Sequence, residues 1–363
     1  TISLSPESIA RHKDMKIVYT PIHGTGVEIV PAALKAFGFT NIIHVPEQDI
    51  ISGDFPTVIS PNPEEPAALA MAVQRAKDTD AELVLATDPD ADRVGAAVKN
   101  NEGEWVLLNG NQTALMFVYY LITRWKELGK IKGNEYIVKT IVSTELIRTI
   151  AERNGVELYD VYTGFKWIAA IMKDNEGKKT FIGGGEESYG FLCEDFVRDK
   201  DAVSACTMLA ETAAWAKDKG LTLYQLLQNI YVEYGFSKEA GISVVKKGKS
   251  GAEEIEAMMK HFRENPLTQI AGSNVTYVYD YATLKGLSVA ENEKITLDMP
   301  TTSNVIQYFT EDNTKVSIRP SGTEPKIKFY CEVHSKVKNL EELPAAELAA
   351  QEKINQIKIS LGI

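Results

Sequence analysis

Two hydrophobic periods alternate along the first third of the chain, and they predict strands separated by helices. Short apolar runs bounded by turn residues are typical of buried strands, whereas apolar residues every three or four positions are typical of helices. Gly38 ends the first predicted helix. This order predicts an α/β layer with a largely parallel sheet. The expected elements are strands at 16–19, 41–45 and 81–86, helices at about 27–37 and 66–77, and a hairpin turn at 101–104.

A second α/β unit is expected from about residue 108. Its strand-loop-helix rhythm resembles that of the first unit, although the sequence contains no clear repeat. A glycine-rich loop is expected at 183–190, after the last strand. The other expected elements are helices at 111–128, 144–153, 164–173, 201–218 and 222–233, and strands at 136–142, 157–161 and 179–182.

Strands dominate from about residue 237 onwards, which predicts an antiparallel α+β module with its helices on one face. The strands are expected at 240–245, 274–281, 305–309, 315–318 and 326–333, and the helices near 251–263 and 345–360. The sequence therefore predicts two consecutive α/β domains with mixed sheets, at 1–107 and 108–236, followed by an α+β domain at 237–363.

Composition limits the class of protein. A chain of 363 residues is too long for one ordinary hydrophobic core. Hydrophobic residues make up 44% and charged residues 25%, which is typical of a soluble globular protein. The net charge of −11 and the pI near 5.2 argue against a nucleic-acid partner. They still allow an anionic small substrate, because local basic loops can oppose the overall sign.

The cysteines and the N-terminal residues indicate the cellular compartment to expect. Cys193, Cys206 and Cys331 lie in apolar contexts without paired spacing, so we expect buried reduced thiols in a cytoplasmic protein. No apolar run reaches membrane-spanning length and no signal peptide opens the chain, so we expect no membrane partner. The chain does not begin with Met, which suggests a piece of a longer protein.

The segment 88–93, Asp-Pro-Asp-Ala-Asp-Arg, is the strongest candidate site. It follows an apolar strand, and its alternating carboxylates of Asp88, Asp90 and Asp92 would converge on one point. Carboxylate oxygens without nearby Cys or His ligands favour a hard ion such as Mg²⁺ over zinc. An EF-hand is excluded, because Arg93 and Lys99 stand where its Gly and Glu are required. An acidic surface turn is the alternative.

The segment 319–325, Arg-Pro-Ser-Gly-Thr-Glu-Pro, predicts an anion site between two strands. Arg319 can contact a phosphate with two N–H groups, Ser321 and Thr323 add hydroxyls, and Gly322 exposes a backbone N–H. Lys326 and Lys328 follow this run. An ordinary hairpin is the alternative interpretation.

Three further segments are ambiguous by themselves. In the loop 183–190, Glu186, Glu187 and Ser188 could bind sugar hydroxyls, and the glycines allow a close backbone approach. His23 precedes a Gly-Thr-Gly run that could hold an anion at a helix start or could form a plain capping turn. Lys166 opens a helix and could face a cleft or lie on the surface. Together, a metal loop, a hydroxyl-binding loop and a phosphate clamp indicate a phosphosugar enzyme.

Three motifs occur in the order found in the α-D-phosphohexomutase superfamily, which includes phosphoglucomutases and phosphomannomutases. They are Asp-Pro-Asp-Ala-Asp-Arg at 88–93, Gly-Glu-Glu-Ser at 185–188 and Arg-Pro-Ser-Gly-Thr-Glu-Pro at 319–325. The chain resembles the second, third and fourth domains of such a four-domain enzyme, over nearly its whole length. The Asp-Pro-Asp-Ala-Asp and Gly-Glu-Glu-Ser-Tyr variants favour the phosphoglucomutase side, extending to phosphopentomutases, over bacterial phosphomannomutases.

The resemblance implies a role for each matched residue and an interconversion of hexose 1-phosphate and hexose 6-phosphate. The implied assignments are Mg²⁺ ligands at Asp88, Asp90 and Asp92, support of a phosphoserine by Arg93, a substrate-facing lysine at Lys166, sugar-hydroxyl contacts at Glu186 and Ser188, and binding of the non-reacting phosphate at Arg319, Ser321 and Thr323.

The family's nucleophile, a phosphoserine in a Thr-x-Ser-His-Asn-Pro loop of the first domain, has no match in this sequence. Ser60-Pro-Asn-Pro63 lacks the histidine and precedes the metal loop, so we interpret Ser60 as an ordinary loop residue. We therefore expect a fragment without its phosphoserine domain, inactive as a mutase by itself. The alternatives are a phosphosugar-binding pseudoenzyme, a metal-dependent phosphatase, and, within the family, a phosphomannomutase or phosphopentomutase. The expected partners are a phosphosugar and the missing N-terminal domain.

Overall fold

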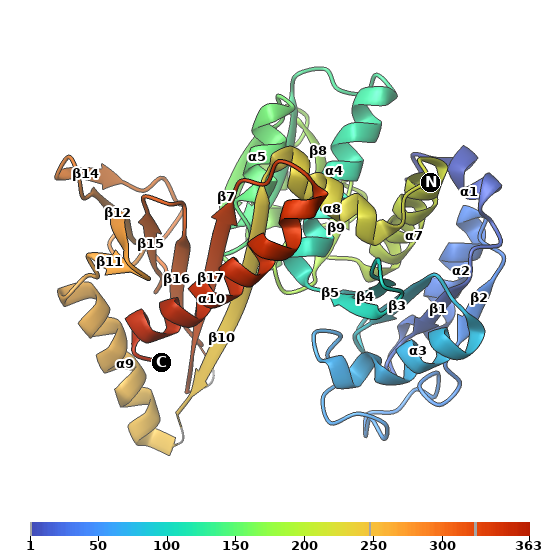
Figure 1. Ribbon diagram of the computed structural model, residues 1–363, viewed down its shortest axis with the longest axis horizontal. Helices are drawn as coiled ribbons and strands as arrows, with labels where there is room; N and C mark the ends of the chain where they lie inside the picture. Colours follow the sequence, from blue (N-terminus) through green and yellow to red (C-terminus); the bar gives the residue numbers. More distant parts are fainter. Residues whose placement is uncertain (1, 247, 323–324) are drawn as a thin grey trace. The chain divides into compact units, whose positions relative to one another are not determined.

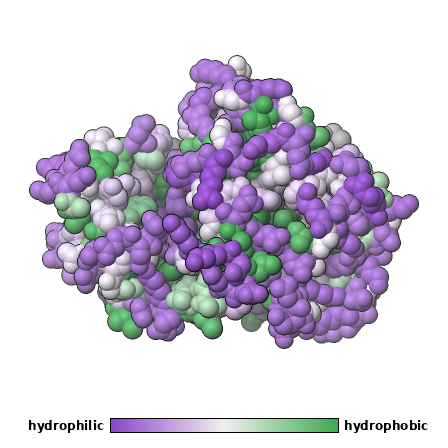
Figure 2. Space-filling view, turned by 45° about the horizontal axis from the view of Figure 1, so that its top comes forward, coloured by the Kyte–Doolittle hydropathy of each residue, from purple (hydrophilic) through white to green (hydrophobic). Residues whose placement is uncertain are grey.

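The computed structural model describes residues 2–246, 248–322 and 325–363 and divides into two compact units, Thr1–Ile230 and Tyr231–Ile363 (Figure 1). Among the described residues, no helix combines the length and apolarity needed to span a bilayer. The face shown in Figure 2 is largely hydrophilic, with scattered hydrophobic side chains.

The first sheet of the first unit has five strands in the order β2-β1-β3-β4-β5. The first three pair in parallel, and β4 and β5 return antiparallel, so the sheet is mixed. The strands are β1 (Ile17–Thr20), β2 (Ile42–His44), β3 (Leu83–Thr87), β4 (Val94–Lys99) and β5 (Trp105–Leu108).

Helices cover both faces of this sheet. The helices are α1 (Pro6–Arg11), α2 (Gly26–Phe37) and α3 (Pro66–Thr79), joined by α7 (Ala202–Asp218) from later in the chain. Val18 packs with Ala72 and Ala76 of α3. Tyr19 points to the opposite face, where its hydroxyl lies beside Gly26 at the start of α2. The helix α7 packs against α2, β3 and β4, so two parts of the chain share one core.

The second sheet of this unit has four strands in the order β7-β6-β8-β9, with β9 antiparallel and the others parallel. Tyr136 and Val138 form a core with Ile168 and Met172 of α6, while α4 packs against β8. The strands are β6 (Glu135–Thr140), β7 (Glu157–Val161), β8 (Thr180–Gly185) and β9 (Phe191–Cys193), and the helices are α4 (Gly110–Glu127), α5 (Leu146–Arg153), α6 (Phe165–Asp174) and α8 (Leu223–Tyr234).

The second unit is an antiparallel sheet in the order β10-β17-β16-β15-β12-β13-β14, with β11 paired to β12. Phe329 contacts Phe262 of α9, and Cys331, on the same face, lies near Lys358 of α10, so both helices cover one face as predicted. The strands are β10 (Phe236–Val245), β11 (Gln269–Ile270), β12 (Ser273–Asp280), β13 (Lys285–Ser288), β14 (Glu293–Thr296), β15 (Ile306–Thr310), β16 (Lys315–Pro320) and β17 (Lys326–Ser335), and the helices are α9 (Gly248–Glu264), η1 (Leu340–Glu342) and α10 (Leu343–Leu361).

The fold class predicted from the sequence is confirmed, and so is the hairpin turn at 101–104, because β4 and β5 pair antiparallel on either side of it. One local prediction is wrong. The residues 183–185 were expected in a loop and instead form the end of β8. Glycines are required there, since a Cβ atom at Gly184 would lie 2.7 Å from the carbonyl oxygen of Val138. The sequence pattern also does not predict α1, β9, β11, β13, β14 and η1.

Candidate active site

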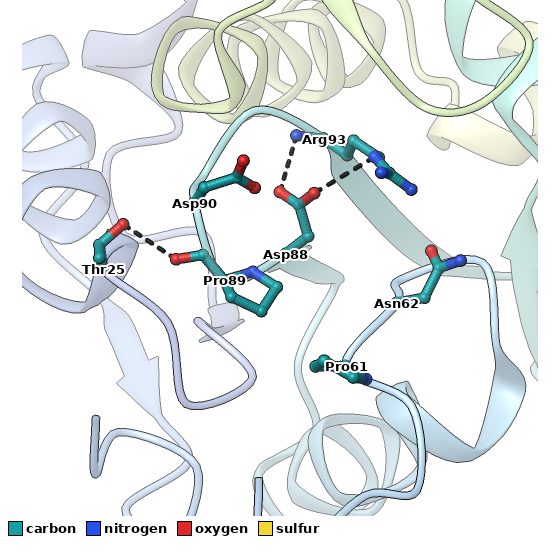
Figure 3. Close-up of a pocket in the computed structure, with 7 residues that line it drawn as sticks. All are labelled: Thr25, Pro61, Asn62, Asp88, Pro89, Asp90 and Arg93. Carbon is teal, nitrogen blue, oxygen red and sulfur yellow. Dashed lines mark hydrogen bonds and ion pairs between the residues drawn. The ribbon is translucent and has the colours of Figure 1, made fainter. Parts of the chain in front are cut away.

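The metal-loop candidate lies where β3 ends, at the carboxyl edge of the first sheet (Figure 3). The loop that follows β1 reaches the same edge, since parallel strands present their carboxyl ends together. Thr25 donates its backbone N–H and its hydroxyl to the carbonyl oxygen of Pro89, at 2.8 and 3.0 Å. A Cβ atom at Gly24 would lie 2.4 Å from the Cα atom of Pro89, so only glycine allows this contact.

Asp88 is the buried centre of the loop, with 4% of its surface exposed. Its Oδ1 accepts the backbone N–H groups of Asp92 (3.0 Å) and Arg93 (2.9 Å), and the Arg93 side chain lies 3.3 Å from Oδ2. Ala91 turns the chain with a φ of 56°. Burial raises the pKa of Asp88 to about 7, and the neighbouring carboxylates of Asp92 and Asp90 contribute to this rise. The hydrogen bond from the Arg93 backbone N–H acts in the opposite direction and lowers this pKa.

The three aspartates offer ligand oxygens that all lie within 4.8 Å of one another. Asp92 Oδ1 is buried and has no hydrogen-bond partner within the part of the chain that the structure describes. Three carboxylates that converge in this way, one of them with a buried oxygen that accepts no hydrogen bond, form a donor set that fits a divalent cation with oxygen ligands. The aspartates predicted from the sequence are therefore brought together as that prediction requires.

A pocket of about 570 Å³ opens at this loop. Asn62, for which no motif in the sequence indicates a role, lies in this pocket on the segment after Ser60 (Figure 3). Ser60 itself is exposed in a loop. The pocket is lined by Thr25, Pro61, Asn62, Asp88, Pro89, Asp90 and Arg93.

The loop after β8 lies beside the metal loop within the same unit. Arg93 and Gly190 form an antiparallel bridge, and Val94 donates its backbone N–H to Tyr189 at 3.0 Å. The N–H of Ala202 donates to the carbonyl of Ala91 at 3.1 Å. Two motifs that are far apart in the sequence are thus joined by backbone hydrogen bonds.

The two glutamates of this loop are held in place. Glu186 is 5% exposed, and its Oε1 accepts the N–H of Gly164 at 2.6 Å, which ties it to the segment that starts α6. Burial raises the pKa of Glu186. Glu187 accepts the hydroxyl of Thr140 at 2.8 Å. Ser188 is half-buried in the same loop.

Lys166 and His23 have different environments. Lys166 is exposed in the first turn of α6, with its ammonium 5.0 Å from the ring centre of Trp167. His23 is buried, and its two ring nitrogens bond to the carbonyl of Ile50 and the hydroxyl of Thr57, each at 2.8 Å. Both ring nitrogens of His23 are thus used in hydrogen bonds within the fold, so His23 is a structural residue of the capping turn rather than an anion ligand.

The phosphate-clamp candidate is a hairpin in the second unit. Arg319 is half-buried at the end of β16, and the N–H of Ser321 donates to the carbonyl of Lys326 at 2.7 Å. Gly322 is exposed, and no atom of the described residues lies within 4 Å of the position of a Cβ atom there. Thr323 lies outside the described residues, so its predicted role stays a prediction.

Comparisons with known families identify the class of protein. The family model described as "Phosphoglucomutase/phosphomannomutase, alpha/beta/alpha domain II" matches residues 4–103, that of domain III matches 109–234, and that of the C-terminal domain matches 274–350. The chain therefore belongs to the phosphoglucomutase/phosphomannomutase family, and the resemblance inferred from its motifs is confirmed.

Particular relatives are named phosphoglucomutase. The chain is 36% identical over 330 residues to the protein of Staphylococcus haemolyticus (strain JCSC1435), covering 91% of this chain and 59% of the relative. It is 38% identical over 317 residues to that of Staphylococcus aureus (strain MRSA252), covering 87% and 56%. The chain thus spans less than two thirds of these relatives.

Solved structures share the fold. The phosphoglucomutase pp63/parafusin from Paramecium, in an open form, matches with a TM-score of 0.63 and 16% identity, covering all of this chain and 61% of that one. A phosphoglucomutase/phosphomannomutase family protein from Burkholderia thailandensis matches with a TM-score of 0.61 and 17% identity, covering 99% and 64%.

Proposed function

We propose that this chain supplies the metal-binding, sugar-recognition and phosphate-binding domains of a phosphohexomutase, an isomerase that interconverts hexose 1-phosphate and hexose 6-phosphate. The main support is the gathering of three carboxylates within 4.8 Å beside the loop that carries Glu186. The names of the Staphylococcus relatives favour a glucose phosphate over a mannose or pentose phosphate as substrate.

The reaction in this proposal is phosphoryl transfer through a phosphoserine and a sugar bisphosphate. The phosphoserine donates its phosphoryl group to the sugar, the bisphosphate reorients, and the other phosphate returns to serine. Because this transfer depends mainly on positioning and charge stabilisation, the protein needs fixed cations and hydroxyl ligands rather than covalent groups of its own beyond the serine.

Each side chain has a defined task in the proposal. A bound Mg²⁺ would supply positive charge for the transfer. The proposed roles are Mg²⁺ ligation by Asp88, Asp90 and Asp92, positive charge near the reacting phosphate from Arg93 and Lys166, hydroxyl contacts from Glu186 and Ser188, and phosphate binding by Arg319, Ser321, Gly322 and Thr323.

The nucleophile is expected to come from sequence outside these 363 residues, because no Thr-x-Ser-His-Asn-Pro run occurs within them. A phosphosugar and the family's first domain are therefore the proposed partners, with neither nucleic acid nor membrane. We also propose a cytoplasmic location. The three cysteines are buried free thiols, which suits a reducing compartment.

A coupled assay tests the missing nucleophile. The 363-residue chain with glucose 1-phosphate, Mg²⁺ and a glucose bisphosphate activator should show only background formation of glucose 6-phosphate. Turnover that Ser60→Ala abolishes would show that the nucleophile lies in this chain. Release of inorganic phosphate from the sugar would instead support the phosphatase alternative.

Calorimetric titration with Mg²⁺ tests the metal site. The parent chain should bind Mg²⁺, and Asp90→Asn should lose most of this binding, because the substitution removes one anionic ligand and a charge. Asp54→Asn is a suitable control, since Asp54 is an exposed aspartate of a neighbouring loop. Equal Mg²⁺ affinity in the parent and Asp90→Asn chains would refute the assignment.

A further inference from the structure

Lys200 extends from the segment between β9 and α7 to the metal loop. The backbone that follows it is held by hydrogen bonds. Asp201 caps α7 by accepting the N–H groups of Val203 and Ser204, at 3.2 and 2.9 Å, and donates its own N–H to Phe191 at 3.0 Å. The next residue, Ala202, is bonded to Ala91 of the metal loop. The main chain therefore presents Lys200 at a fixed place beside the aspartates.

The aliphatic part of the Lys200 side chain packs directly over Gly190. A Cβ atom at Gly190 would lie 2.6 Å from Lys200 Cδ and 3.5 Å from its Cγ, so glycine at this position leaves the space that the stem occupies. Gly190 is also the residue that bridges to Arg93. The same glycine thus joins the two loops and admits the lysine.

The ammonium of Lys200 lies 2.5 Å from Asp92 Oδ2. It is 3.7 Å from the exposed Asp199, and Glu186 adds a further negative charge nearby. The other oxygen of Asp92, Oδ1, is buried without a hydrogen bond among the described residues, and Arg93 Nε lies 3.8 Å from it. Lys200 therefore binds one oxygen of Asp92 and leaves the other to a ligand.

We propose that Lys200 is a positioning residue of the metal site: it holds Asp92 in the metal-free loop and competes with the divalent cation for that carboxylate. The inference rests on the proposed Mg²⁺ site. An ammonium beside the site repels an incoming cation, so the chain binds Mg²⁺ more weakly than its three carboxylates alone would, and the loop keeps its shape without metal.

The test is calorimetric titration of Mg²⁺ into the 363-residue chain and its variants. Lys200→Gln should bind Mg²⁺ about 5-fold more tightly, because a positive charge is removed next to the site. Lys200→Arg keeps the charge and should stay close to the parent. Gly190→Ala displaces the lysine stem and should change the affinity in the same direction as Lys200→Gln. Lys173→Gln, at an exposed lysine of α6, is the control for net charge.

Thermal unfolding gives a second readout. Without Mg²⁺, Lys200→Gln should unfold at a lower temperature than the parent, because the aspartates lose their counter-charge. Saturating Mg²⁺ should close this gap. A residue that only anchors the segment would lower the unfolding temperature equally with and without the metal.

The outcomes separate the two hypotheses. If Asp90→Asn leaves Mg²⁺ binding unchanged, the proposed metal site fails and the role of Lys200 fails with it. If Asp90→Asn removes binding while Lys200→Gln binds Mg²⁺ with equal or lower affinity, the site stands and the role of Lys200 is refuted. Should Lys200→Gln not fold, tighter binding by Gly190→Ala supports the role, and unchanged binding overturns it.

Discussion

Replacing Gly110 by alanine places a methyl group between the start of α4 and the loop that carries Glu186. Gly110 is the first residue of α4 and is buried. A capping box holds this helix start, in which Asn109 Oδ1 accepts the N–H of Gln112 at 2.8 Å and Gln112 Oε1 accepts that of Asn109 at 3.0 Å. The new Cβ atom would lie 2.0 Å from the carbonyl oxygen of Glu187.

The size of the effect follows from this distance. Since Cβ contacts in real structures do not fall below 3.0 Å, the helix start or the loop must move by roughly 1 Å. The obstacle is backbone, so no side-chain rotation relieves it. Overpacking of this kind costs about 1–3 kcal/mol, and the higher helix propensity of alanine offsets up to about 1 kcal/mol. We expect Gly110→Ala to lower the free energy of unfolding by about 1–2 kcal/mol.

Urea unfolding followed by tryptophan fluorescence measures this change in the relevant unit. All four tryptophans, Trp105, Trp125, Trp167 and Trp215, lie in the first unit. Gly53→Ala is the matched control, because nothing lies within 4 Å of a Cβ atom there, and it should stay within about 0.5 kcal/mol of the parent. A Gly110→Ala chain at least as stable as the parent would refute the reasoning.

Three further substitutions give independent tests. Arg11 binds Asp218, and its hydrogen bond is the largest cause of the lowered pKa of this carboxyl. Asp218→Asn should therefore lower the free energy of unfolding by about 1 kcal/mol at pH 7. In pH-dependent unfolding, the difference in stability between the parent and the variant should shrink as the pH falls below about 4, where the carboxyl of the unfolded chain protonates. Lys139 is 1% exposed and lies 2.8 Å from Asp160, so Lys139→Met should cost about 2–4 kcal/mol in urea unfolding, and a neutral result would contradict this. Arg319→Lys keeps the charge but loses the two-pronged donor, and a chemical-shift titration with glucose 6-phosphate should show roughly 10-fold weaker binding; an unchanged response would reject the clamp.

Much of the fold follows from local signals in the sequence. The helix 66–77 and the strand 157–161 were predicted close to their observed bounds, since period and turn residues are properties of neighbouring positions. The glycines at 183–185, expected in a loop, form the end of β8. Their strand state depends on partners elsewhere in the sheet, and pairing overrides the weak β propensity of glycine.

The sequence by itself determined the two α/β regions followed by an α+β region, the family, and the three aspartates of the metal loop. A carboxylate loop after a strand can be recognised from adjacent residues. Only the tertiary structure decided that Lys200 passes Gly190 to reach Asp92, that Asn62 lines the pocket, and that one oxygen of Asp92 lacks a hydrogen bond among the described residues. These contacts join segments that are far apart in the sequence, so the hydrophobic pattern of neighbouring residues does not predict them. They arise where the carboxyl edge of one sheet meets a loop of the next, and long-range packing alone selects which side chains meet there.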